Sequence, residues 1–383
     1  MDKIDKVLLR SVAEILPSKE GLAKLMESRK IRVYIGVDPT GSKLHLGHTI
    51  GLRKLQEFAD LGHEAILVVG TGTVLAGDPA QRAETRKKIT KEEIDENIKT
   101  WKSQAEKILD FKKIQIKYNG DWLKKLGYED ILNIASNISA TQLFKREMFQ
   151  NRIDRGDTIW THELLYPLFQ GYDSVVMDVD LEIGGTDQTF NMLIGRELQK
   201  KMENREKYVL TTPLVNGTDG KPMSKSSGNC IWLDDSAGDM YGKIMSLADT
   251  EIVSYWQNLT DLDPKQMTSL KSIDAKKHLA FEITKQYHGD SDAQSAQGNF
   301  ENVFQKGQTP ENIEKVKVEK SKWKVIDFLV EKNLADSKSA AKRLLDQGAI
   351  EINGQTQKES GVEFKNGQVV KIGKKKFVRV TLK

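Results

Sequence analysis

Two histidines three residues apart, His45 and His48, are the first residues of this 383-residue chain whose types and spacing suit chemistry. They follow a β-branched run, residues 31–37, which predicts a buried strand, and the turn-forming sequence Pro-Thr-Gly-Ser. A helix is predicted from Leu46, so both imidazoles can face its N-terminus, where backbone N–H groups favour phosphate. Two ordinary surface histidines are the simpler interpretation, and only a second signal favours the phosphate site.

That second signal is the loop GKPMSKSSGN, residues 220–229. It gathers Lys221, Lys225, three serines and two glycines between two strand-like runs, residues 208–215 and 230–233. Taken alone, such a charged loop would be a solvated hairpin. Together with the two histidines, it indicates a site that binds phosphate groups at two separate segments.

A polar stripe marks a predicted helix over residues 161–172. Tyr166, Gln170 and Asp173 recur at helical spacing and therefore lie on one face. Packing would explain a buried tyrosine, but burying a glutamine and an aspartate without partners is costly. The stripe therefore favours a ligand-facing surface. Further on, Gly185 permits close backbone approach to a ligand, and Asp187 can accept a hydrogen bond from a ribose hydroxyl.

The elements around these residues predict an α/β fold with a Rossmann-like parallel sheet. Residues 31–37, 46–58 and 65–69 read as strand, helix and strand. Residues 5–29 predict one or two amphipathic helices, residues 91–109 a helix, and residues 174–183 a strand. We expect a catalytic domain over residues 1–230 with an insertion at about 90–160, then a helical domain over 231–315 and a charged hinge over 316–324.

Composition limits the function classes. The chain is 38% hydrophobic and 30% charged, as in soluble globular proteins, and no apolar run approaches the ~20 residues of a membrane helix. The N-terminus shows no secretory or transit pattern, and the single cysteine, Cys230, excludes an internal disulfide and argues against a cysteine-built zinc site. We expect a cytoplasmic protein that contacts no membrane and has no metal site of its own.

Positive charge collects near the C-terminus. Residues 321–383 hold 14 Lys and Arg against 7 Asp and Glu, although the whole chain carries a net charge of only +4. This segment predicts helices at 325–329 and 337–345, a strand at 349–352, a turn at Asn353-Gly354 and strands within 364–382. A solubilising tail is the alternative, but a basic helix and hairpin suit an RNA backbone. The basic residues are Lys338, Lys342, Arg343, Lys374, Lys375 and Lys376.

HLGH and MSKS resemble the two signatures of class I aminoacyl-tRNA synthetases. The motifs GVDPTGSKLHLGH, AGDPAQRAETR, YPLFQGYD, IGGTDQ and MSKS follow the order and spacing of bacterial tyrosyl-tRNA synthetases over nearly the whole chain. The C-terminal segment resembles an S4-type RNA-binding domain. The rivals are a tryptophanyl enzyme of the same subclass and a non-catalytic RNA-binding paralogue. Tyr34, Asp173 and the tail count against the first, and the retained signature residues against the second.

The resemblance implies ATP-dependent activation of L-tyrosine with Mg²⁺, transfer of the tyrosyl group to tRNA(Tyr), and a homodimer. It also implies residue roles. The phenol would contact Tyr34 and Asp173; the α-ammonium Asp78, Tyr166 and Gln170; and the carboxylate Gln188. The nucleotide would contact Asp38, Gly47, Gly185 and Asp187. The pyrophosphate would contact Thr40, His45, His48, Lys221, Lys225, Arg82 and Arg86. Pro222 stands where the family has the first lysine of KMSKS, which leaves the role of Lys221 open.

Overall fold

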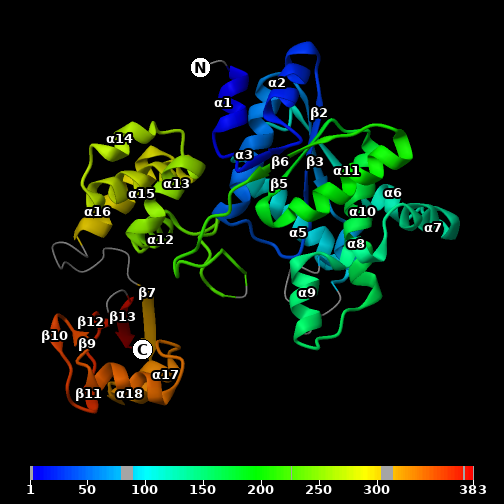
Figure 1. Ribbon diagram of the computed structural model, residues 1–383. Coiled ribbons are helices and arrows are strands. Elements are labelled where there is room, and N and C mark those ends of the chain that lie inside the picture. The colour runs from blue at the N-terminus through cyan, green and yellow to red at the C-terminus, as the bar shows by residue number, and fades with distance from the viewer. Residues whose placement is uncertain (1–2, 79–88, 226, 303–313, 374–375, 383) are drawn as a thin grey trace. The chain divides into compact units, whose positions relative to one another are not determined.

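The computed structural model describes residues 3–78, 89–225, 227–302, 314–373 and 376–382 (Figure 1). The chain forms two compact units, Met1–Ala293 and Gln294–Lys383, and each is considered by itself. Within the described ranges, no helix has both the length and the apolar character needed to cross a membrane.

A six-stranded sheet forms the centre of the first unit, in the order β1-β6-β5-β2-β3-β4. The five strands from β6 to β4 are parallel, and β1 pairs antiparallel with β6 at the edge. Apolar side chains bury β2 and β3 on both faces, as parallel sheets require. The predicted α/β parallel-sheet fold is confirmed. The strands are β1 Glu14–Leu16, β2 Arg32–Val37, β3 Glu64–Val69, β4 Ile114–Tyr118, β5 Leu181–Gly185 and β6 Tyr208–Thr212.

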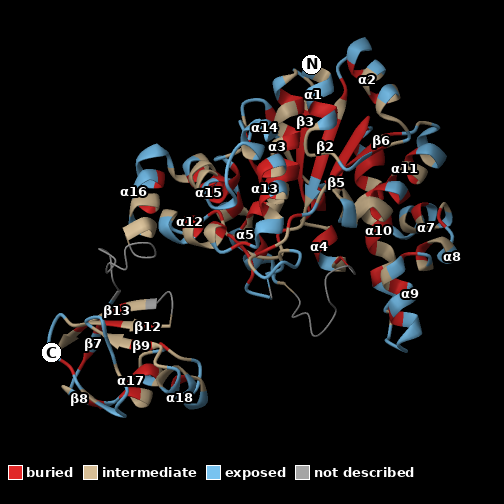
Figure 2. Cartoon of the chain, turned by 60° about the vertical axis from the view of Figure 1, so that its left-hand side comes forward, coloured by how far each residue is buried: buried red, intermediate tan, exposed pale blue. Residues whose placement is uncertain are grey.

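Helices cover both faces of this sheet (Figure 2). The helix α3 Leu46–Asp60 lies against one face, and α10 Thr161–Met177 and α11 Thr189–Glu203 lie against the other. A Cβ on Gly171 of α10 would lie only 2.9 Å from Gly195 Cα of α11, so glycine permits this close packing. The other helices before α10 are α1 Lys3–Leu9, α2 Lys19–Ser28, α4 Thr73–Ala76, α5 Lys91–Ala105, α6 Gly120–Leu123, α7 Tyr128–Ser136, α8 Ala140–Phe144 and α9 Glu147–Asp154.

Some local predictions are wrong. Residues 174–177 continue α10 instead of starting a strand, because the burial of Val175 and Met177 in the helix outweighs the strand preference of the β-branched valines. Residues 14–16 form the strand β1, although residues 5–29 were predicted to be helical. Three residues are too few to show the alternation of a strand. Residues 230–233 are not a regular strand; they make only an isolated bridge between Trp232 and His45.

A helical segment completes the first unit. Its core contains Tyr241, Tyr255 and Trp256, each fully buried. Arg53 of α3 donates hydrogen bonds to Asp261 and Gln286, which ties this segment to the sheet domain. Whether it is a separate domain with the predicted bounds stays a prediction. The helices are α12 Ala237–Met245, α13 Ile252–Leu259, α14 Pro264–Thr268, α15 Ser272–His288 and α16 Asp290–Phe300, the last extending into the second unit.

The second unit is a small α+β module. Its five-stranded sheet has the order β10-β9-β12-β13-β7, and a separate pair joins β11 and β8. Val316 and Val318 of β7 are buried and pair in parallel with β13, so the predicted hinge over 316–324 is wrong. Alternating valines and lysines there form a strand of the module. Its elements are β7 Glu314–Val318, β8 Lys322–Lys324, α17 Val325–Glu331, α18 Lys338–Asp346, β9 Ile350–Ile352, β10 Gln355–Thr356, β11 Gly361–Glu363, β12 Val369–Ile372 and β13 Lys376–Leu382.

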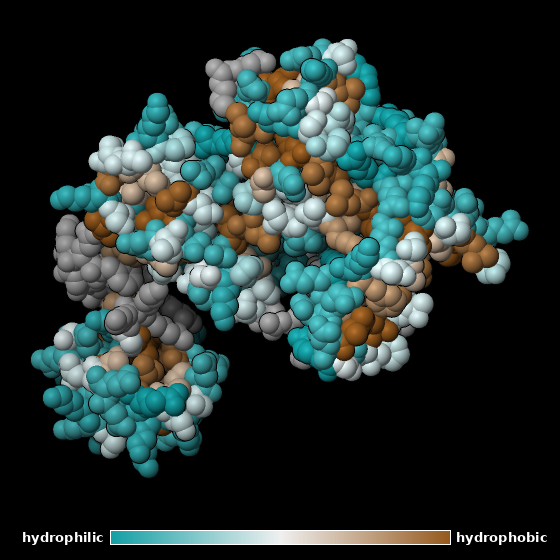
Figure 3. Space-filling view, viewed as in Figure 1, coloured by the Kyte–Doolittle hydropathy of each residue, from teal (hydrophilic) through white to brown (hydrophobic). Residues whose placement is uncertain are grey.

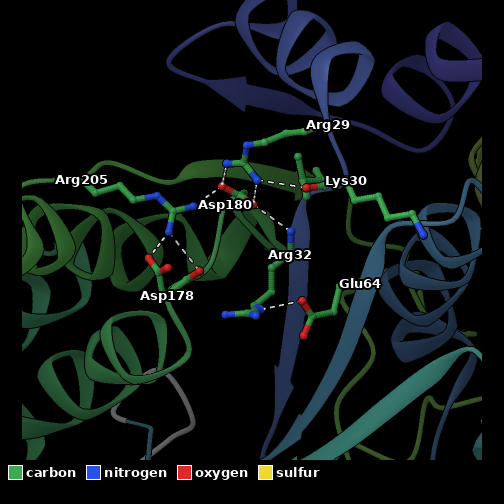
Figure 4. Close-up of a pocket in the computed structure, with 8 residues that line it drawn as sticks. Arg29, Lys30, Arg32, Glu64, Asp178, Asp180 and Arg205 are labelled. Carbon is green, nitrogen blue, oxygen red and sulfur yellow. Dashed lines mark hydrogen bonds and ion pairs between the residues drawn. The ribbon is translucent and has the colours of Figure 1, made fainter.

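A hollow of about 440 Å³ lies at the amino ends of β2 and β3 (Figure 4). Asp180, at its centre, accepts hydrogen bonds from Arg29 (2.9 Å), the Arg32 backbone N–H (2.8 Å) and Arg205. Burial raises the pKa of Asp180, but these donors outweigh it and hold the pKa below its usual value. Since each acidic residue of the hollow, Asp178, Asp180 and Glu64, pairs with an arginine, we assign the hollow the structural role of fixing the strands.

Candidate active site

Polar residues lie at the carboxyl ends of the parallel strands, and two of them, Asp38 and Asp187, were selected from the sequence. Asp38 follows β2, Asn119 follows β4 and Asp187 follows β5. The strand order reverses between β2 and β5. On one side of β2 lie β3 and β4, and on its other side lie β5 and β6. Ligands of open α/β sheets bind at such a switch point. The fold therefore places these polar residues at the edge where open α/β sheets bind ligands.

The two signature segments meet at this edge. The backbone N–H of Leu46 donates to Ile231 O (2.9 Å), and that of Leu233 donates to Leu44 O (2.9 Å). These bonds anchor the chain leaving the MSKS loop to the start of α3. At the loop itself, Lys225 Nζ donates to Thr40 Oγ1 (3.1 Å). The structure thus joins Thr40 and Lys225, which are 185 residues apart in the chain.

The two histidine rings contact each other at the N-terminus of α3, with their planes tilted by 41°. Their ring centroids are 3.7 Å apart, and the His45 backbone N–H donates to His48 Nδ1 (3.1 Å). Because Nδ1 accepts, the neutral ring carries its proton on Nε2. Burial and the nearby Lys225 lower the pKa of His45 to about 4; burial, His45 and Lys225 lower that of His48 as well. Both rings are therefore neutral N–H donors at pH 7.

Tight packing fixes these rings and the loop before them. A Cβ on Gly47 would lie 3.0 Å from the His45 ring, so only glycine fits without displacement. From α5, Trp101 Nε1 donates to Gly41 O (2.6 Å) and Asn97 donates to Pro39 O (2.9 Å). The Trp101 ring also lies 5.7 Å from Lys225 Nζ. The helix α5, predicted only as part of an insertion, is thus a support of the site that the sequence analysis missed.

Asp173, Ser174 and Tyr34 are buried polar side chains that form a cluster, called the pocket below. Asp173 Oδ1 accepts from Trp122 Nε1 (2.8 Å), and Oδ2 accepts from Asn119 Nδ2 (3.1 Å). Tyr34 lies fully buried on β2, and its hydroxyl is 2.8 Å from Ser174 Oγ. Burial raises the pKa of Asp173 to about 8, although the bonds from Asn119 and Trp122 act in the opposite direction. A carboxylate this costly to bury suits a site that receives a donor from a ligand.

The buried carboxyl gives a pH-dependent stability. The unfolded pKa of Asp173 is near 3.8 and the folded value is about 8, so the folded chain holds a proton that the unfolded chain releases. Folding stability therefore falls as pH rises from about 4 to 8, by up to about 1.4 kcal/mol per unit. We expect Asp173→Asn to gain stability relative to the original chain across that window. Urea unfolding at pH 5 and pH 8 measures this difference, and an equal gap at both pH values would contradict it.

Other predicted residues form a network around the pocket. The Tyr166 hydroxyl donates to Asp38 Oδ2 (2.9 Å), and Thr73 Oγ1 donates to Asp38 Oδ1 (2.7 Å). Gln188 Nε2 donates to Asp78 Oδ2 (3.1 Å). The sequence analysis missed Thr73, Asn119, Trp122, Ser174 and Arg146, which lies 3.5 Å from the Asp78 carboxylate. Asn119 carried a usable signal, because it directly follows the apolar alternation of β4, which the sequence analysis did not predict as a strand.

Several predicted residues are less well placed or lie elsewhere. Lys221 is exposed, and its backbone joins the base of the MSKS loop through Asp219 and Gly217. Asp187 is exposed beside Gln188 Nε2 (3.0 Å), and a Cβ on Gly185 would lie 2.4 Å from Asp187 Oδ1. Arg82, Arg86, Lys374, Lys375 and the Lys376 side chain lie outside the described residues. Among described residues, no group of three or more His, Cys, Asp or Glu side chains could hold a metal.

The chain matches known proteins over nearly its whole length. A family model described as tRNA synthetases class I (W and Y) matches residues 26–305, and one for the tyrosine–tRNA ligase SYY-like C-terminal domain matches residues 305–380. A tyrosine–tRNA ligase of Thermotoga maritima is 41% identical over 98% of this chain and 96% of its own length. That of Aquifex aeolicus is 38% identical over 98% and 97%.

Solved structures agree on the fold. A C-terminally truncated mitochondrial tyrosyl-tRNA synthetase of Aspergillus nidulans matches with a TM-score of 0.66, at 21% identity over 79% of this chain and 93% of its own. A tyrosyl-tRNA synthetase of Archaeoglobus fulgidus, solved with L-tyrosine, gives 0.62 at 22% identity over 77% and 99%. By its full-length relatives and both family models, this chain belongs to the tyrosine–tRNA ligase family of class I tRNA synthetases.

Proposed function

We propose that this chain activates L-tyrosine with ATP, releases pyrophosphate, and transfers the tyrosyl group to the terminal ribose of tRNA(Tyr). The observation that carries the proposal is one arrangement at the sheet edge. The HLGH segment is hydrogen-bonded there to the chain that follows the MSKS loop, and Asp173 accepts hydrogen bonds from Asn119 and Trp122, which follow β4. The residue roles below are part of the proposal.

The amino acid would lie with its phenol between Tyr34 and Asp173, which accepts the phenol proton as a hydrogen bond. Its α-ammonium has three N–H donors and would meet oxygen atoms of Asp78, Tyr166 and Gln170. Gln188 would contact its carboxylate. Binding of a phenol donor favours the ionised form of Asp173, which offsets the burial that raises its pKa.

The reaction of the tyrosine carboxylate with ATP needs no nucleophile or base from the protein. The tyrosine carboxylate attacks the α-phosphorus of ATP, and the bond to the pyrophosphate oxygen breaks. Thr40, the imidazole N–H groups of His45 and His48, and Lys225 would stabilise the charge that grows on the leaving phosphates. Lys221, Arg82 and Arg86 are proposed to assist. Mg²⁺ would enter bound to the phosphates of ATP. Asp38, Gly47, Gly185 and Asp187 would contact the adenosine.

The test is amino-acid-dependent exchange of labelled pyrophosphate into ATP. We expect exchange with L-tyrosine and none with tryptophan or phenylalanine at equal concentration. Exchange with tryptophan would retain the reaction and overturn the pocket assignment. No exchange with any of the three would overturn the proposed activity.

We propose that the C-terminal module contacts the tRNA. Lys338, Lys342 and Arg343 are all exposed on α18, and the face of this unit seen in Figure 3 is mostly hydrophilic. We propose that the helical domain expected over residues 231–315 binds the anticodon arm of the tRNA. The S4-type assignment of the module stays a prediction.

Reversing the three charges of α18 to glutamate is expected to slow tRNA charging by about tenfold or more, because phosphate contacts are lost. Pyrophosphate exchange with tyrosine should stay within twofold, since α18 lies in the other unit. The control is Lys24→Glu in α2, an equally exposed charge reversal. Charging at the original rate by the α18 variant would contradict the proposed RNA contact.

We further propose a cytoplasmic homodimer. Large apolar side chains are exposed on the region between β4 and α10: Tyr128 is 77% exposed, Trp160 61%, and Leu132 and Ile153 49% each. Brown surface at α7 and α9 in Figure 3 belongs to this region. Large apolar side chains exposed in this way are typical of association sites.

Light scattering should give twice the chain mass of 43.3 kDa. Replacing Tyr128 and Leu132 with glutamate should shift the mass toward the monomer, whereas Val253→Glu, an exposed apolar position on α13, should not. A monomer at micromolar concentration before any substitution would refute the dimer.

A further inference from the structure

A fully buried ion pair lies behind the pocket and has no role in the mechanism above. Lys207 precedes β6, Glu182 lies on β5, and Lys207 Nζ bonds the Glu182 carboxylate. Their side chains are 0% and 2% exposed. Burying two charges costs several kcal/mol per ion before their attraction is counted, and an apolar pair often replaces them without loss of stability. Stability alone therefore does not explain this pair, which points to a functional role.

The ion pair reaches the pocket through one hydroxyl. Lys207 Nζ donates to Ser174 Oγ (2.5 Å), and Ser174 Oγ lies 2.8 Å from the Tyr34 hydroxyl. An ammonium group can only donate, so the serine oxygen accepts from Lys207. The serine proton then lies most favourably away from the positive charge, toward Tyr34. With its oxygen accepting from Ser174, the Tyr34 hydroxyl directs its own proton elsewhere.

The orientation of Tyr34 matters for the phenol of the substrate. A phenol that donates to Asp173 has an oxygen that must accept, and Tyr34 can serve it only as a donor. Burial, with the Glu182 and Asp173 carboxylates, raises the pKa of Tyr34 well above its usual value, so the tyrosine keeps its proton. Glu182 also accepts a hydrogen bond from Tyr34, so a bound phenol would take this proton in place of Glu182. The bonds would then run in one direction, from Lys207 through Ser174 and Tyr34 to the ligand and Asp173.

The packing around Lys207 favours this single arrangement. A Cβ on Gly195 would lie 2.6 Å from Lys207 Nζ and 3.3 Å from Ser174 Oγ, so the glycine of α11 leaves room for the ammonium group. On the other side of the pair, Glu182 accepts from Gln170 Nε2 (3.2 Å), which fixes the direction of that amide. The same ion pair thus orients one proposed ligand of the phenol and one of the α-ammonium.

We propose that Lys207, held in place by Glu182, is a positioning residue that acts through Ser174 to point the Tyr34 hydroxyl into the pocket. This inference rests on the proposed tyrosine activation. It makes the buried pair a determinant of selection for amino acids that carry a phenol. Without the pair, Tyr34 can turn its proton back to Ser174 and present only an acceptor to the phenol.

The test compares pyrophosphate exchange with tyrosine and phenylalanine in two variants. Lys207→Met with Glu182→Gln removes both charges together and leaves an acceptor for Gln170. Ser174→Ala breaks the connection with a smaller change and serves if the double variant does not fold. In each, we expect the ratio of kcat/KM for tyrosine over phenylalanine to fall about tenfold or more through a higher KM for tyrosine. The kcat value and the KM for ATP should stay within twofold.

A matched control is available in α3. Lys54 is also fully buried and pairs with Glu57 (2.6 Å), but it bonds the N-terminal segment through Val7 O and Arg10 O. Lys54→Met with Glu57→Gln should leave the ratio unchanged whatever it does to stability. If active Lys207 or Ser174 variants kept the ratio of kcat/KM for tyrosine over phenylalanine, or lost activity equally with both amino acids, this inference would be wrong. The proposed function would not be affected by that result. An original chain without tyrosine-dependent exchange would overturn the proposed function and, with it, this inference.

Discussion

Asp173→Ala is expected to remove most of the discrimination between tyrosine and phenylalanine. Trp122 and Asn119 hold the two carboxylate oxygens at 2.8 and 3.1 Å, in a side chain that is only 3% exposed. With phenylalanine bound, Asp173 and Tyr34 would lack the partner that a phenol supplies. Unpaired buried polar groups of this kind reject the wrong substrate, and tyrosyl-tRNA synthetases are themselves the standard example of the effect.

The loss should fall on one substrate. We expect kcat/KM for tyrosine in pyrophosphate exchange to drop by about 10²-fold or more, while that for phenylalanine stays constant or rises. Asp180→Ala is the control, because Asp180 is a buried aspartate at the opposite edge of the sheet and should affect stability instead. If Asp173→Ala kept its discrimination, the pocket assignment would be wrong.

Contiguous patterns explain what the sequence predicted well. The runs that became β2 and β3, the histidine pair at the start of α3 and the stripe of Tyr166, Gln170 and Asp173 each lie within one short segment. Local periodicity and turn chemistry determine such features. The same locality explains the errors. The lysines between the valines of β7 led to the prediction of a charged hinge instead of a strand. The two valines after Ser174 led to the prediction of a strand, whereas packing against α11 favours a helix there.

Contacts between distant segments could not be predicted in this way. The bonds that join Leu46 to Ile231 and Leu44 to Leu233 depend on how the whole sheet domain folds. Glu182 is an instructive case. The predicted strand at 174–183 holds three acidic residues, Asp178, Asp180 and Glu182, and nothing in the sequence distinguished Glu182. Its partner Lys207 became evident only when β5 and β6 paired. Trp101, which the sequence analysis missed, supports the site by donating to a backbone oxygen, that of Gly41. A pattern of side chains in the sequence gives no sign of such a contact.

Lys225→Gln is expected to slow tyrosyl-adenylate formation by roughly 10²-fold, with little change in the KM for tyrosine. The ammonium group lies 3.1 Å from Thr40 Oγ1 and belongs to the same edge as the two histidines. Because those rings are neutral at pH 7, Lys225 carries the positive charge of this cluster. A cation aimed at charge that develops on the leaving phosphates acts mainly in the transition state, so kcat should fall more than binding weakens.

Two lysines provide the comparison. Lys43 also connects the HLGH and MSKS sides, through an ion pair with Asp234 (2.9 Å), but it is half exposed and paired. Lys43→Gln should therefore cost less than a few-fold in kcat, as surface ion pairs contribute little. Lys221→Gln tests the position displaced by Pro222, and its exposed place at the loop base predicts a smaller loss than that of Lys225. Single-turnover adenylate formation separates these effects from product release.

A Lys225 variant that raised only the KM for tyrosine would show that this lysine binds the ground state. Stabilisation of the leaving phosphates would then have to come from Thr40, the two histidines, or Arg82 and Arg86.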